Sequence, residues 1–256
     1  MKRWQIISVL LFSYFFFLIA GIPASRVLHY LQQSGSAPAT ITGVEGSIWN
    51  GHADALLIPG QPKLENINWS INPFSLMIAR LSAHVEAEVH KQTITGHVSR
   101  NFLNGNVFAS DVTTKLPASV LQKIIDMPFG ELGGDVEIFL DQVNWQKDMV
   151  PLIEARIYWQ HAKLTLAQTI DMGQVNITVL PNDANQTNVT LSNTAGDLTM
   201  NGEATLGTDR SYSLSLTMKP KDATGDVAQS LNLFAQRQAD GLYRFKQNGN
   251  LRSLGF

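Results

Sequence analysis

The segment LSAHVEAEV, residues 81–89, alternates apolar and polar side chains along its whole length. Successive side chains of a strand point to opposite faces, so this alternation predicts a strand with one apolar and one hydrated face. The pattern recurs in DVEIFL (135–140), QVNITV (174–179) and SYSLSLTM (211–218). Antiparallel sheets with one wet face carry this signature. The chain is therefore predicted to be mainly β, with a large antiparallel, twisted or curved sheet.

Four Asn-Gly pairs are predicted to be hairpin turns, because a type I′ turn needs positive φ at both central residues. They begin at Asn50, Asn104, Asn201 and Asn248. The first pair ends the stretch GVEGSIWNG, residues 43–51, and predicts a first hairpin over residues 43–58 with Ile48 and Trp49 before the turn at Asn50-Gly51. Gly43 and Gly46 would permit a bulge or a close backbone approach. A phosphate cradle is the alternative for this glycine spacing, but no helix N-terminus or basic neighbour follows. An exposed Trp49 would instead favour a contact role.

Two segments have helical periodicity. LPASVLQKIIDMP (116–128) has Pro117 at a first helical position and Val120, Leu121, Ile124 and Ile125 on one face. TGDVAQSLNLFAQRQADG (224–241) has apolar residues at helical spacing and a stop at Gly241. Both are predicted to be amphipathic helices that cover the sheet.

An internal repeat relates the two halves of the chain. INWSINPFSLMIARL (67–81) aligns without a gap on VNWQKDMVPLIEARI (143–157), which matches Trp69 with Trp145 and Arg80 with Arg156. TTKLP (113–117) and LTMKP (216–220) each precede one of the predicted helices. Chance similarity between strands is the alternative. The repeat predicts two similar halves, about 41–130 and 131–256, each with one short amphipathic helix.

The N-terminus carries the apolar run WQIISVLLFSYFFFLIAGI, without a charge from Trp4 to Ile22. As a helix rising about 1.5 Å per residue, it would span about 29 Å, close to the thickness of the hydrocarbon core. Lys2 and Arg3 precede it and place the N-terminus in the cytoplasm. The alternative, a cleaved signal peptide, usually has an apolar region of about 7–15 residues and a small-x-small site, which residues 20–24 do not offer. An uncleaved transmembrane anchor is therefore predicted.

These features predict a bitopic layout. Residues 1–3 are expected to be cytoplasmic, 4–22 transmembrane and 23–40 a linker that ends in small polar residues, followed by one β-rich domain over residues 41–256.

A search for reactive groups supports no catalytic, cofactor-binding or metal site. The chain has no cysteine, and its six histidines do not form metal-ligand spacings. Asp135, Glu137 and Asp141 cluster on one strand, where a solvated face is the simpler explanation. Lys and Arg are scattered and the net charge is -2, so the chain has no electrostatic footprint for nucleic acid.

Several residues are instead expected to be structural. Trp69 and Trp145 fall in strand patterns and are predicted to pack in the core. Arg80 and Arg156 are predicted to pair with a carboxylate or to extend from a sheet face. The candidate structural signature consists of Gly43, Gly46, Trp49, Gly51, Trp69, Arg80, Trp145 and Arg156.

The order of these motifs resembles the type II secretion system protein N family. The resemblance runs from the apolar N-terminus through GVEGSIWNG, INWSINPFSLMIARL, LPASVLQKI, WQHAKL, LSNTAGDLTMNGEATL and RSYSLSLTMKP to GLYRF and Leu251. It implies a protein of the Gram-negative inner membrane with its bulk in the periplasm. It further implies a non-enzymatic accessory part of the machine that exports folded proteins across the outer membrane, with other inner-membrane components of that machine as partners.

Two other functions remain open. The family is also distantly similar to AsmA-type proteins, which implies an open β groove for binding or transferring lipid. Alternating strand faces agree with a groove, but any β core has the same pattern. A membrane-anchored hydrolase is a third class, and the sequence offers no candidate residues for it.

Overall fold

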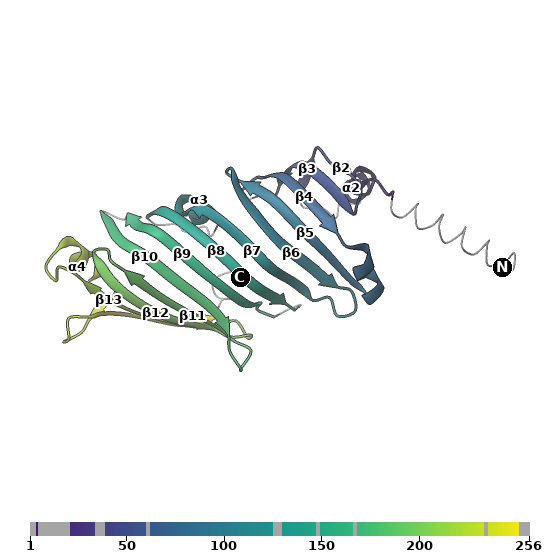
Figure 1. The fold of residues 1–256 in the computed structure, drawn as a ribbon. Helices are drawn as coiled ribbons and strands as arrows, with labels where there is room; N and C mark the ends of the chain where they lie inside the picture. The colour runs from purple at the N-terminus through teal and green to yellow at the C-terminus, as the bar shows by residue number, and fades with distance from the viewer. Residues whose placement is uncertain are drawn as a thin grey trace. The chain divides into compact units, whose positions relative to one another are not determined.

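The computed structural model describes Trp4 and residues 21–33, 39–59, 62–124, 130–146, 149–165, 168–232 and 235–250. The chain forms two compact units, residues 1–93 and 94–256. Each unit consists mainly of antiparallel strands (Figure 1). The prediction of a mainly β, antiparallel fold is therefore confirmed. The predicted membrane span lies outside the described residues except for Trp4, Gly21 and Ile22, and no helix in the described part is long and apolar enough to cross a membrane.

The first unit has strands in the order β1-β3-β4-β5, with the short β2 also paired to β3. Helix α2 precedes them, and the short 3-10 helix η1 joins β4 to β5. Residues 24–33, predicted to lie in a linker, thus form a helix. The bounds are α2 Ala24–Gln33, β1 Thr40–Thr42, β2 Glu45–Gly46, β3 Asn50–Leu57, β4 Leu64–Ile71, η1 Pro73–Ile78 and β5 Arg80–Val89.

The first hairpin differs from its prediction. Gly46 pairs with Gly51, so the turn consists of residues 47–50, and Asn50-Gly51 belongs to β3. Ser47 closes the turn: its N–H donates to Asn50 O at 2.9 Å, and its Oγ accepts from the N–H groups of Trp49 and Asn50. A Ser hydroxyl that bonds its own backbone is an alternative turn device to Asn-Gly.

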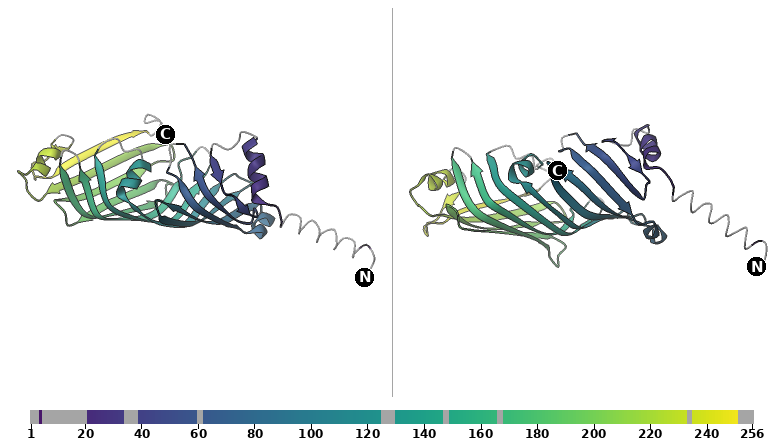
Figure 2. Two further views of the ribbon diagram at one scale, coloured as in Figure 1. Left: turned by 90° about the horizontal axis from the view of Figure 1, so that it is seen from above. Right: turned by 45° about the horizontal axis from the view of Figure 1, so that its top comes forward.

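The second unit is a meander in the order β6-β7-β8-β9-β10-β11-β12-β13-β15-β14. Figure 2 shows that this sheet curls toward its yellow end. The bounds are β6 Gln92–Asn101, which starts two residues before the unit, β7 Val107–Pro117, α3 Ala118–Ile124, β8 Glu131–Trp145, β9 Leu152–Thr165, β10 Thr169–Pro181, β11 Thr187–Thr194, β12 Leu198–Leu206, β13 Ser211–Pro220, α4 Asp226–Leu231, β14 Gln236–Arg237 and β15 Tyr243–Asn250.

Both predicted helices exist, but each is shorter than its pattern. Pro117 is the last residue of β7, and α3 begins at Ala118. The second helix ends at Leu231, because Gln236 and Arg237 pair with β15 as strand β14. The predicted end at Gly241 is therefore wrong. Ala118 and Val120 of α3 are buried, whereas the side chains of Ile124 and Ile125 lie outside the described residues.

The ungapped repeat does not place equivalent residues at equivalent positions. Trp69 lies within β4, but Trp145 is the last residue of β8. Arg80 opens β5, whereas Arg156 is the fifth residue of β9. The connection between β4 and β5, residues 72–79, is longer than the connection between β8 and β9, residues 146–151. An ungapped alignment therefore matches residues at different positions along the two pairs of strands.

The Asn-Gly pairs serve two different purposes. Gly105 has φ 73 and lies in the turn between β6 and β7, as predicted. The other three glycines lie inside strands, without positive φ, and face a large side chain on the next strand. An added Cβ would lie 2.2 Å from Trp69 at Gly51, 2.4 Å from Leu216 at Gly202 and 2.8 Å from Tyr212 at Gly249. Here glycine provides space for a neighbour.

We expect Gly51→Ala to destabilise the protein by about 1–3 kcal/mol, the usual cost of overpacking, because the new methyl group overlaps the Trp69 ring. In a Trp69→Leu background the cost should fall, because the ring is gone. Urea unfolding of the detergent-solubilised chain, followed by circular dichroism, measures both.

Gly133→Ala is the matched control, because its Cβ would lie 3.4 Å from the nearest atom, Cβ of Lys163. An equal cost for Gly51→Ala in both backgrounds would show that the ring is not the cause.

Candidate functional site

The first unit carries an apolar pocket between α2 and the sheet. It has a volume of about 330 Å³ and is lined by Ala24, Val27, Leu28, Ile41, Val44, Ile48, Trp69 and Ile71. The indole Nε1 of Trp69 donates to Ile48 O at 3.1 Å, which fixes the ring at the side of the pocket. Trp69 is half-buried: its ring lies against Gly51 and lines the pocket opposite α2.

The chain enters this unit beside the first hairpin. Ile48 N–H donates to Ile22 O at 3.1 Å, and Pro23 forms a β-bridge with Ser47. On the other side of the turn, Ile71 N–H donates to Trp49 O at 2.6 Å. Trp49 is half-buried and belongs to this backbone junction. GVEGSIWNG is therefore the element that joins Ile22 to the end of β4.

The remaining glycines of the signature permit close backbone approach. Gly43 has φ 64 and Gly46 has φ 80. A Cβ on Gly43 would overlap the Asp54 side chain, and one on Gly46 would lie 2.6 Å from Asn50 O. β1 and β2 pair with β3 in the same register, so the kink at Gly43 inserts no extra residue.

In the second unit, one face of the sheet is apolar from β8 to β15. One row of side chains that crosses the strands on this face is mostly buried. This row lies beside helices α3 and α4. The row runs through Leu116, Val136, the half-buried Trp159 and Val175 on β7 to β10. Val175 pairs with the buried Asn193 of β11, and Met218 of β13 pairs with Met200 of β12 and Tyr243 of β15. Ala228 and Leu231 of α4 belong to the same core.

Two further rows on the same face are less covered. Their side chains are mostly half-buried, although they are nearly all apolar. One row contains Ile138, Ile157, Ile177, Leu191, Leu216 and Phe245, and the other contains Leu140, Val179, Val189, Ala204 and Leu214. We call these two rows the apolar inner face. Burial thus decreases along the strands, from the row beside the helices to the rows beyond them.

The opposite face of this unit carries exposed ion pairs. Arg156 forms two hydrogen bonds with Asp141, at 3.2 and 2.9 Å, and Lys115 Nζ lies 2.7 Å from Glu137. The bond to Asp141 raises the pKa of Arg156, and the bond to Glu137 raises the pKa of Lys115. Such pairs add little stability at a surface. Two of the three carboxylates in the predicted acidic cluster, Glu137 and Asp141, are thus paired with basic side chains.

Two other residues of the predicted structural signature, Trp145 and Arg80, are exposed. Trp145 is 54% exposed at the end of β8, so its predicted core packing is wrong. Arg80 is exposed at the start of β5.

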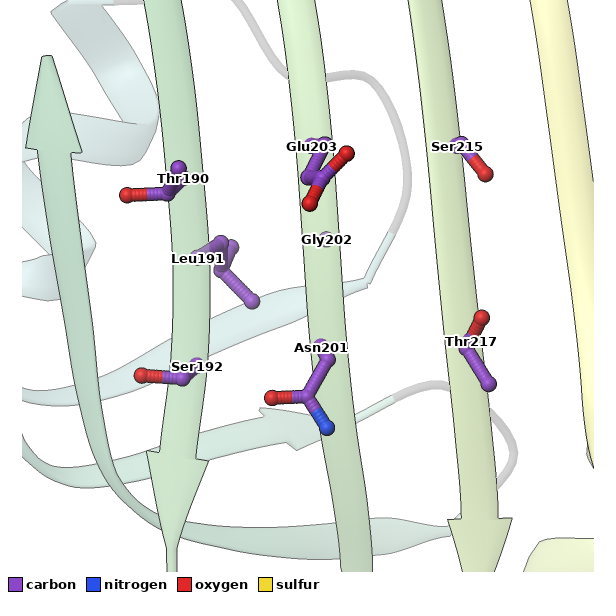
Figure 3. Close-up of a pocket in the computed structure, with 8 residues that line it drawn as sticks. All are labelled: Thr190, Leu191, Ser192, Asn201, Gly202, Glu203, Ser215 and Thr217. Carbon is purple, nitrogen blue, oxygen red and sulfur yellow. The ribbon is translucent and has the colours of Figure 1, made fainter. Parts of the chain in front are cut away.

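A shallow polar pocket of about 390 Å³ lies over β11, β12 and β13 (Figure 3). Thr190, Glu203 and Ser215 form one cross-strand row, and Ser192, Asn201 and Thr217 form the next. Glu203 is the one carboxylate among its lining residues. Hydroxyl groups around a single acid offer neither a nucleophile with a base nor a ligand set. Within the described residues, no group of three or more His, Cys, Asp or Glu side chains is placed to hold a metal.

The described elements define a mainly β protein with open antiparallel sheets, short helices and apolar surfaces. The chain belongs to the type II secretion system protein N family, whose model matches residues 37–246. It is 23% identical over 238 residues to the type II secretion system protein N of Vibrio cholerae serotype O1, which covers 89% of this chain and 93% of that protein. No solved structure matches the chain significantly.

Proposed function

We propose that the chain is a non-enzymatic accessory subunit of the type II secretion system. The observation that carries this proposal is the family match over residues 37–246. In the proposed arrangement, Trp4–Ile22 anchors the chain in the inner membrane, with the N-terminus in the cytoplasm and the β units in the periplasm. Its partners are other inner-membrane components of the same machine, and its role is to support the export of folded proteins across the outer membrane.

The structure of the first unit agrees with an anchor at this position. Ile22 ends the apolar run and is bonded to Ile48 in the first hairpin. Helix α2 follows at once and packs against the apolar pocket beside Trp69. Because the end of the apolar run is hydrogen-bonded to the sheet, no long flexible linker would separate the proposed anchor from the first unit.

Deletion of the protein in its native host tests the secretion role. We expect an exported folded enzyme to accumulate in the periplasm, and the full chain supplied from a plasmid should restore its activity in the culture medium. Affinity isolation from native membranes should recover other secretion components by mass spectrometry. Normal export in the deletion strain, together with no recovered component, would contradict the proposal.

The anchor is tested by placing arginine in the apolar run. Each arginine at the centre of a spanning helix costs about 2.5–3.5 kcal/mol for insertion. The double variant Leu11→Arg, Phe16→Arg should therefore leave the membrane fraction during alkaline carbonate extraction, whereas Ser25→Arg on α2 should stay. The membrane-bound wild type should have the uncleaved mass of 28.2 kDa. A shorter membrane-bound form would indicate cleavage, and retention of the double variant would place the attachment elsewhere.

A lipid-binding role is a second candidate, which the apolar inner face favours. Half-buried Ile, Leu and Val side chains continue across neighbouring strands. The first of the two rows packs against the core, and the second lies beyond it. Contiguous apolar surface that a protein does not cover commonly marks an interaction site. Acyl chains of a lipid would complete its burial.

We expect Val189→Asp on the apolar inner face to lower the amount of lipid that copurifies with the full chain several-fold, because a carboxylate is poorly solvated beside acyl chains. Lipid is measured by mass spectrometry after detergent-free extraction in polymer-bounded discs, relative to discs around an unrelated single-pass protein.

Thr190→Asp is the matched control, because Thr190 is the next residue of β11 and points to the opposite, exposed face. Equal lipid content in the two variants, with unchanged thermal unfolding, would exclude this candidate.

A further inference from the structure

The turn between β4 and β5 presents an unusual set of apolar side chains to solvent. Phe74 is 69% exposed, Leu76 40%, Met77 84% and Ile78 67%. These four side chains come from one 3-10 helix, η1, and we call them the apolar tip. Isolated exposed apolar residues are common, but four from a single turn form a patch that marks an interaction site.

The backbone of the turn is held by its own polar groups. Asn72 caps η1, since Phe74 N–H donates to its Oδ1 at 3.0 Å and the Ser75 hydroxyl donates to its carbonyl at 2.6 Å. Ser75 is buried, and its Oγ accepts from Ser82 N–H. Ala79 ends the turn with φ 54, and its N–H donates to Leu76 O.

This construction suits a hydrocarbon environment. Backbone groups that enter lipid must be bonded internally, because no water is available to replace the bond. Ser75 faces the body of the turn and Asn72 bonds its backbone, so the exposed side chains of η1 itself are Pro73 and those of the apolar tip. Such rigidity also lowers the entropic cost of insertion.

The apolar tip belongs to the end of the unit at which the chain departs toward its N-terminus. Ile22 accepts from Ile48, and the adjacent Trp49 accepts from Ile71, which lies two residues before η1. The apolar run ends at Ile22. Two backbone hydrogen bonds and one turn therefore connect the end of the proposed anchor to the start of η1. Figure 2 shows η1 at the same end of the first unit as the start of α2.

The charges of these segments complement an anionic membrane. Residues 21–33 and 71–80 contain Arg26 and Arg80 but no Asp or Glu. Anionic lipid headgroups attract basic residues near the surface and repel acidic ones. A protein partner with a hydrophobic groove would not require this absence of acid.

We propose that the apolar tip inserts into the periplasmic surface of the membrane that holds the anchor, as a second, interfacial attachment. This inference rests on the proposed anchor at Trp4–Ile22. Interfacial apolar elements bury about 5–10 Å into the boundary between headgroups and acyl chains. Phe74, Met77 and Ile78 would occupy that depth, while Arg80 at the start of β5 meets the headgroups.

The full chain has no cysteine, so single cysteines can be labelled without removing others. Met77→Cys is labelled with an environment-sensitive fluorophore, and the full chain is reconstituted in vesicles of phosphatidylethanolamine and phosphatidylglycerol that carry nitroxide on the acyl chain. Ile78→Cys is a second reporter at the same turn. Ile58→Cys is the matched control, because this exposed apolar residue follows β3, at the opposite end of that strand from Asn50.

We expect lipid nitroxide to quench the labels at positions 77 and 78 several-fold more than the label at position 58, with blue-shifted emission. Equal quenching at all three positions, or access of soluble iodide to position 77, would overturn the inference. So would efficient crosslinking of Met77→Cys between two copies in place of lipid contact.

A label at Ser13→Cys, within the apolar run, separates this inference from the proposed function. Quenching at position 13 without quenching at 77 would leave the anchor intact and reject insertion of the apolar tip. An unquenched label at position 13 would reject the anchor itself, whatever happens at position 77.

Discussion

The structure of the second unit depends on how an antiparallel sheet covers its apolar face. An alternating strand buries one side, and a sheet of many such strands presents a continuous apolar surface. Two short helices, α3 and α4, are available to cover it, and the buried core collects beside them. Curling of the sheet supplies further cover (Figure 2). The apolar inner face lies beyond the helices and stays half-buried, so the fold itself produces a surface that a ligand or partner would complete.

Close strand packing depends on glycines that are hard to interpret from local sequence. Gly51, Gly202 and Gly249 each leave room for a ring or a branched side chain on the neighbouring strand. An Asn-Gly pair is the strongest short signal for a hairpin turn, and at Asn104-Gly105 the signal is right. In the other three pairs, the deciding contact comes from a residue elsewhere in the chain. The sequence window around each glycine does not contain that residue, so period and turn chemistry could not distinguish a turn from a close packing contact.

The faces of the strands were more predictable than their ends. The alternation in residues 81–89 and 211–218 matches β5 and β13, because a period of two follows directly from strand geometry. Helix ends failed where tertiary pairing intervened: Gln236 and Arg237 continue a helical pattern but pair with β15. The apolar tip at η1 lies inside the repeat alignment, which predicted no structure for its residues. The exposure of Phe74 and Met77 depends on the buried Ser75 and on the positive φ of Ala79, and neither can be inferred from apolar spacing.

Two attachments would constrain the first unit in a way that one cannot. A single spanning helix fixes the height of the domain above a bilayer, but leaves it free to rotate about the helix axis and to tilt about the junction. The bonds from Ile22 to Ile48 and from Trp49 to Ile71 make that junction part of the sheet. An apolar tip buried beside the anchor would add a second fixed point and so restrict tilt. The strand ends at η1 would then face the membrane, and the ends at Leu57 and Val89 would face away from it. A subunit of the proposed kind, anchored in the membrane beside its partners, would depend on such a fixed orientation, because those partners would meet it in one membrane plane.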